Sequence, residues 1–91
     1  MEIALPGQEL IQEGLRDLQA GHETVAALLV AIGAPKLRSL GIELPVNLPK
    51  NPEHRLYALL ANSNSDSAHS RYNALIRRLV SFERAAACVS R

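Results

Sequence analysis

Five arginines follow a regular spacing in the last quarter of the chain. Arg77, Arg84 and Arg91 recur every seven residues, and Arg71 and Arg78 form a second pair with the same spacing. At about 100° per residue, each set lies on one side of a helix. A guanidinium group binds a carboxylate or a phosphate through two parallel hydrogen bonds. The spacing therefore predicts a basic helix face that binds an acidic protein surface or a row of phosphates.

The segment from residue 66 to 88 is the helix that must carry these arginines. Its apolar residues fall in a single arc over three helical periods: Ala68, Tyr72, Leu75, Ile76, Leu79, Phe82 and Ala86. This amphipathic pattern predicts a helix packed on the rest of the protein by one side. Ser65 or Ser67 can cap its start. Arg77 and Arg84 fall opposite the apolar arc, so we expect both to face solvent.

The charges of the chain are divided by position. Residues 1–45 hold six acidic and three basic residues, whereas residues 46–91 hold three acidic and seven basic residues. Such a division can mark a surface for an acidic partner, or two halves that neutralise each other. We expect Arg77, Arg78 and Arg84 to be exposed and unpaired with the acids of the first helix, Glu9, Glu13 and Asp17. The alternative is a solvated helix face without a partner.

Other residue types that do chemistry are scattered. The three histidines, His22, His54 and His69, have no metal-ligand spacing to each other or to Cys88, so we expect surface histidines and no metal site. Cys88 is the only cysteine, which excludes an intrachain disulfide and fits a reducing cytoplasm. A paired general acid and base is not visible. The sequence thus predicts no catalytic residue and no cofactor.

One short pattern points to an enzyme instead. Arg16-Asp17, followed by His22, resembles the arginine–histidine motif of some helical ribonucleases over seven residues. The resemblance implies a cleft at a dimer interface lined by Arg16 and His22. The pattern crosses Gly21, which is a plausible helix end. A small helical enzyme such as a ribonuclease is therefore the third functional hypothesis.

Length and composition predict one small helical domain over residues 1–91. Hydrophobic residues make up 47% of the chain, which is enough to form a core, and most are Leu, Ile, Val and Ala. The longest uncharged stretch, 24–35, is too short for a membrane span of about 20 residues. Met1–Pro6 lacks the basic start of a signal peptide. We therefore expect a cytoplasmic protein without a membrane segment.

Glycine and proline divide the first half into three helical segments. The first helix is expected at 7–20, because Leu10, Ile11, Gly14, Leu15 and Leu18 share one face. The second, 23–33, is apolar all round, which predicts a buried central helix. A short connection suggests that these two form an antiparallel hairpin. Pro35 can begin a short extra helix over 36–40.

The second half begins with a proline-rich connection. Residues 42–51 contain two prolines that favour an extended chain, and their leucines and Val46 are expected to pack on the helices. Asn51 and Pro52 predict the start of a third main helix, with Asn51 as its side-chain N-cap.

These patterns together predict an all-α fold: a small antiparallel bundle of about four helices, with one short extra helix and a proline-rich extended connection. The first functional hypothesis is a non-catalytic interaction module. It binds a protein partner or a second copy through Arg71, Arg77, Arg78 and Arg84. The alternative is a small nucleic-acid-binding regulator that uses the same arginines, although base-reading side chains are few on this helix.

Overall fold

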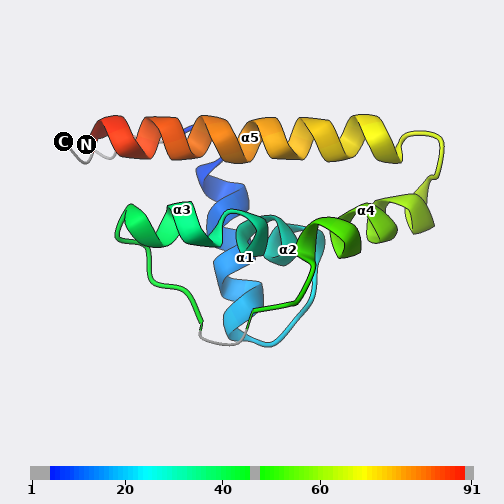
Figure 1. Ribbon diagram of the computed structural model, residues 1–91, viewed down its shortest axis with the longest axis horizontal. Coiled ribbons are helices and arrows are strands. Elements are labelled where there is room, and N and C mark those ends of the chain that lie inside the picture. Colours follow the sequence, from blue (N-terminus) through cyan, green and yellow to red (C-terminus); the bar gives the residue numbers. More distant parts are fainter. Residues whose placement is uncertain (1–4, 46–47, 90–91) are drawn as a thin grey trace.

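The second helix, α2 (Val25–Ile32), is the centre of the protein. All eight of its residues are apolar, and the six from Ala26 to Ala31 are buried. A helix without a polar side can only be stable when other elements cover it all round. The computed structural model, which describes residues 5–45 and 48–89, has the other helices packed around α2 (Figure 1). The prediction of a buried central helix is confirmed.

Residues 5–45 and 48–89 contain four further helices. They are α1 (Gln8–Gln19), α3 (Ala34–Ser39), α4 (Pro52–Ser63) and α5 (Ala68–Val89). No strand occurs in the described residues. The all-α prediction is thus confirmed, including the short extra helix, and the observed ends differ from the expected ones by only a few residues. Arg91 and Val46 lie outside the described residues.

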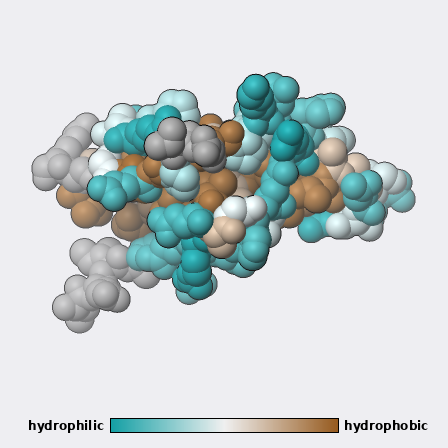
Figure 2. Space-filling model, turned by 90° about the horizontal axis from the view of Figure 1, so that it is seen from below, coloured by the Kyte–Doolittle hydropathy of each residue, from teal (hydrophilic) through white to brown (hydrophobic). Residues whose placement is uncertain are grey.

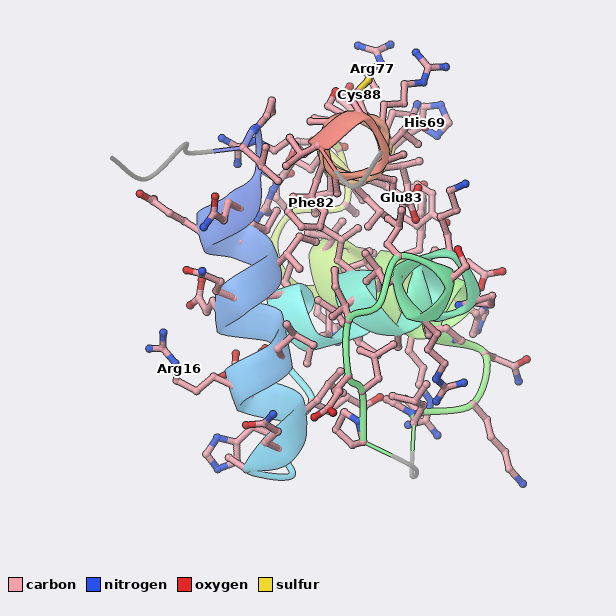
Figure 3. The ribbon with its side chains drawn as sticks, turned by 90° about the vertical axis from the view of Figure 1, so that its left-hand side faces the viewer. Arg16, His69, Arg77, Phe82, Glu83 and Cys88 are labelled. Carbon is pink, nitrogen blue, oxygen red and sulfur yellow. The ribbon has the colours of Figure 1, made fainter. Side chains whose placement is uncertain are left out.

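Helices α1 and α2 pack closely but cross. Figures 1 and 3 show α1 upright in the view, with α2 lying across it, so the pair does not run antiparallel along its length. Gly14 explains the crossing. A Cβ atom at this position would lie 2.3 Å from the Ala26 carbonyl oxygen and 2.4 Å from Val30 Cγ2. Glycine alone lets the two backbones approach this closely, and the short connection between the helices, from which the antiparallel hairpin was predicted, could not reveal this approach.

Helix α5 lies over the other helices and extends along most of the molecule (Figure 1). Leu79, Phe82 and Ala86 are buried on its inner side. The start of α1 approaches it closely, since a Cβ on Gly7 would lie 3.1 Å from the Arg78 carbonyl oxygen. Helix α4 adds Leu56 and Leu60 to the same core.

The starts of α2 and α5 use different capping devices. Thr24 caps α2, because its Oγ1 accepts a hydrogen bond from the Ala27 N–H at 3.2 Å. Before α5, the Asn64 side chain accepts hydrogen bonds from the backbone N–H groups of Asp66 and Ser67. Ser67 itself occupies the position before the helix, and its carbonyl accepts the Arg71 N–H at 2.9 Å.

The start of α4 requires a correction. Helix α4 begins at Pro52 and Asn51 precedes it, as expected, but the Asn51 side chain makes no cap hydrogen bond. Its backbone has φ 51° and ψ 54°, the left-handed conformation that asparagine tolerates better than most residues. The prediction of a side-chain N-cap was therefore wrong. Asparagine suits this position because it adopts the left-handed backbone conformation more readily than most residues do.

The proline-rich connection covers the underside only in part. Ile42, Leu44 and Leu48 are half-buried and pack against the core, as expected for leucines in this segment. Two shallow hollows remain beside it, one lined by Leu44 and Pro45, the other by Leu48 and Pro49. Figure 2, which views the molecule from below, shows apolar surface between hydrophilic side chains on this side.

Candidate interaction surface on the last helix

Helix α5 has two chemically different sides. Its inner side contributes Leu79 and Phe82 to the core, and this attachment fixes the direction of every other side chain on the helix. Figure 3, which views α5 end-on, shows Phe82 pointing into the protein and Arg77 pointing away from it. Arg71, Arg77, Arg78 and Arg84 are all exposed. The expectation that Arg77, Arg78 and Arg84 face solvent is therefore confirmed.

Three of the four predicted arginines lie around one hollow. This hollow, which we call the basic hollow, has a volume of about 420 Å³ and is lined by Val25, Arg71, Ala74, Leu75, Arg77 and Arg78. Val25 and Leu75 are half-buried and supply an apolar floor. Arg84 does not line the basic hollow and lies further along α5. The structure thus brings three predicted residues together and leaves the fourth outside.

The arginines of α5 have no carboxylate partners within the described residues. The ion pair found there joins Arg55 Nη1 to Glu23 Oε1 at 2.7 Å, and neither of these residues lines the basic hollow. None of the four arginines makes an ion pair with Glu9, Glu13 or Asp17. Unpaired guanidinium groups remain available to carboxylates or phosphates of another molecule.

A second hollow adjoins the first. It has a volume of about 450 Å³ and lies mainly on α1, where its lining includes Glu9 and Glu13 together with Arg78. We call it the acidic hollow. Arg78 lines both hollows, so it marks the boundary between a basic and an acidic surface. Leu10, which is half-buried, also lines the acidic hollow.

The apolar floor and the neighbouring acids were missed by the sequence-based prediction. Val25 is almost fifty residues from Arg71 and was assigned to a fully buried helix, yet its place at the first turn of α2 leaves it half-buried. Val25 begins an uninterrupted apolar run, so the sequence pattern could not distinguish it from its buried neighbours. Only the packing of α5 over the start of α2 creates the hollow.

Among the described residues, two titratable side chains have a shifted pKa, and neither lines these hollows. Burial raises the pKa of the Glu83 carboxyl, and the positive charge of Lys36 partly opposes this rise. Burial also raises the pKa of the Tyr72 hydroxyl, with a smaller contribution from the negative charge of Glu53. The centroid of the Tyr72 ring on α5 lies 5.8 Å from the centroid of the Tyr57 ring on α4, and the two rings are tilted relative to each other.

The residues considered for other chemistry lie apart. His22, His54, His69 and Cys88 are all exposed. In the part of the chain that the structure describes, no three His, Cys, Asp or Glu side chains come together as metal ligands. Arg16 projects outward from α1 (Figure 3), and the hollow that His22 lines does not include it. The two residues of the ribonuclease-like pattern therefore share no cleft within this chain.

No protein-family model matches the chain, and no match was found among curated proteins or among solved structures. None of the helices within residues 5–45 and 48–89 has the length and apolar composition needed to cross a membrane. Function is therefore inferred from the geometry of the two hollows.

Proposed function

We propose that this protein is a non-catalytic interaction module that binds a protein partner through the basic hollow of α5. The observation that supports this proposal is the combination of three unpaired arginines with an apolar floor formed by Val25 and Leu75. Protein interfaces favour this composition, since arginine is enriched at their centres and apolar area is buried there.

The two parts of the hollow have different roles in this proposal. Burying the floor provides binding free energy in proportion to the apolar area removed from water, about 25 cal/mol per Å². Arg71 and Arg78 supply directional hydrogen bonds to carboxylates, which determine orientation and the choice of partner. The complementary surface therefore carries apolar side chains flanked by Asp or Glu. We further propose a reducing, cytoplasmic location, because Cys88 has no second cysteine to pair with.

A protein partner is favoured over nucleic acid by the neighbouring acidic hollow. Phosphates that approach Arg78 would also approach Glu9 and Glu13, which line the hollow on its other side. Like charges at such a boundary disfavour binding of a uniformly negative polymer. A protein surface can place its own charges to avoid this repulsion.

Site-specific photo-crosslinking tests the proposal. A benzophenone amino acid replaces Ala74, which lines the basic hollow, and for comparison Asn73, an exposed α5 residue that does not. We expect the Ala74 probe to capture a protein in cell extract treated with nuclease, and the Asn73 probe to capture much less. Substituting Arg71, Arg77 and Arg78 with Gln should abolish capture, whereas Arg84→Gln should not.

The result also separates the alternatives. Crosslinks to RNA or DNA that disappear with nuclease would replace this function with nucleic-acid binding. Equal capture from the Ala74 and Asn73 positions, unaffected by the arginine substitutions, would overturn the proposed site. Melting temperatures of all variants are measured first, since exposed charges contribute only about 0–1 kcal/mol to folding and the variants should remain folded.

A further inference from the structure

The two hollows share Arg78, and together their linings carry both signs of charge. The basic hollow contributes Arg71 and Arg77, the acidic hollow contributes Glu9 and Glu13, and Arg78 belongs to both. The side chains of the two hollows make no ion pair with each other among the described residues. Opposite charges therefore lie side by side without neutralising one another.

A surface of this kind is complementary to itself. Rotation by 180° about an axis through the boundary would bring the acidic hollow of one copy onto the basic hollow of another. The same rotation would bring the basic hollow of the first copy onto the acidic hollow of the second. Two-fold dimers use this type of isologous contact, in which one patch serves both subunits.

We propose that the partner of this surface is a second copy of the chain, bound in a two-fold dimer around Arg78. This inference rests on the proposed function and names its partner. The glutamates of one subunit face the arginines of the other, and the half-buried side chains of Leu10, Val25 and Leu75 supply apolar area between the charged walls.

Charge complementarity favours a second copy of the chain over a uniformly acidic or a uniformly basic partner. A uniformly acidic protein would match Arg71 and Arg77 but would repel Glu9 and Glu13. A basic partner would have the opposite difficulty. Like-charge contacts of this kind weaken an interface and discriminate against a wrong partner. The second copy is the partner that satisfies both hollows at once with surfaces that the chain itself provides.

A charge-swap experiment tests this dimer. One variant carries Glu9→Lys and Glu13→Lys, so both of its hollows are basic; the other carries Arg71→Glu and Arg78→Glu, so both are acidic. In a two-fold dimer, each variant alone brings like charges together at both contacts, and a mixture of the two brings opposite charges together at both. We expect each variant alone to self-associate at least about tenfold more weakly than the parent, and the mixture to associate.

Sedimentation equilibrium provides the readout, from about 1 μM to about 1 mM protein, the range that covers weak to moderate association. The matched control carries Arg16→Glu and Arg84→Glu, which lie outside both hollows and make the same change in net charge as the acidic variant. The control should associate like the parent. Added salt should weaken the parent dimer, because exposed charge pairs are screened.

The outcomes that overturn the dimer are distinct from those that overturn the function. A parent mass of one chain at every concentration, or a mixture that does not associate, would rule out the dimer. If the Ala74 probe then still captured another protein in an arginine-dependent manner, the proposed function would stand with a different partner. Variants that self-associate like the parent would show that the interface lies elsewhere.

Discussion

The hydroxyl of Thr24 donates a hydrogen bond to Asp17 Oδ2 at 2.6 Å, while the same Oγ1 accepts the Ala27 N–H at 3.2 Å. One side chain thus caps α2 and ties it to the last turns of α1. The Thr24 hydroxyl adds a side-chain link between the helices to the backbone hydrogen bond from the His22 N–H to the Asp17 carbonyl oxygen.

Removing this hydroxyl should destabilise the protein. Thr24→Ala loses the cap and the contact with Asp17, so we expect a loss of about 1–2 kcal/mol in the free energy of unfolding. Thr24→Ser keeps the hydroxyl and should stay close to the parent. Urea denaturation measures both. A double-mutant cycle with Asp17→Ala should give a coupling of at least about 0.5 kcal/mol, and zero coupling would mean that the hydrogen bond contributes nothing.

At Gly14, the sign of the stability change on substitution by alanine tests the close approach of α1 and α2. In an exposed helix, replacing glycine by alanine stabilises by up to about 1 kcal/mol. Here the added Cβ would overlap the Ala26 carbonyl and Val30, so Gly14→Ala should destabilise by about 3 kcal/mol, the upper end of the usual effect of overpacking.

Thermal and urea denaturation of Gly14→Ala test the crossing of α1 and α2. Gln12→Ala is the matched control, because Gln12 is exposed on the same helix and its substitution should change stability by less than about 0.5 kcal/mol. An increase in stability for Gly14→Ala would show that the helices do not cross at this point.

Asn51 distinguishes a backbone role from a side-chain cap. If the left-handed conformation decides the choice of residue, Asn51→Ala and Asn51→Ser should each lose about 1 kcal/mol, because both strain the backbone. Asn51→Gly should remain within about 0.5 kcal/mol of the parent. A stable Asn51→Ser variant would instead indicate a capping side chain, since serine is an equally good cap. Chemical denaturation of the four proteins decides between them.

Glu83 should make stability depend on pH. Burial raises the pKa of its carboxyl in the folded protein, so folding favours the protonated form. This contribution to stability is present at low pH and is lost as the pH rises through the folded pKa. Glu83→Gln, which cannot ionise, should therefore be more stable than the parent at pH 7, and the difference should shrink toward about pH 4.

Lys36 provides a second test of the same effect. Its positive charge opposes the rise in the pKa of Glu83, so Lys36→Gln should raise that pKa further. The free energy of unfolding should then fall more between low and neutral pH than it does in the parent. Melting temperatures between pH 4 and pH 7 measure the effect in each variant. A constant difference between parent and Glu83→Gln over this range would contradict it.

The helices could be predicted because their signals are local. The apolar arc from Ala68 to Ala86 defines α5, and the uninterrupted apolar run in α2 requires burial, whatever the details of packing. The exposure of Arg77 and Arg84 follows from the same arc. The contacts between helices, in contrast, have no local signal in the sequence. The close approach at Gly14 and the bond from Thr24 to Asp17 depend on how α1 and α2 meet.

The candidate site shows the same division. The arginines could be selected by their spacing along one helix. The basic hollow could not be predicted, because its floor includes Val25 from α2. The charge boundary at Arg78 depends on the start of α1 meeting α5. Contacts between residues so distant in sequence leave no mark in helical periodicity.

The two sides of α5 would link folding to the proposed assembly. Leu79, Phe82 and Ala86 attach this helix to the core from within, while the arginines face outward from the same backbone. A partner can bind the outer side only when α5 is packed on the core, that is, in the folded protein. Binding therefore shifts the equilibrium toward the folded state by mass action. For a self-associating chain, the melting temperature becomes a function of protein concentration. If the proposed dimer forms, the protein therefore reaches its full thermal resistance only at concentrations at which it associates.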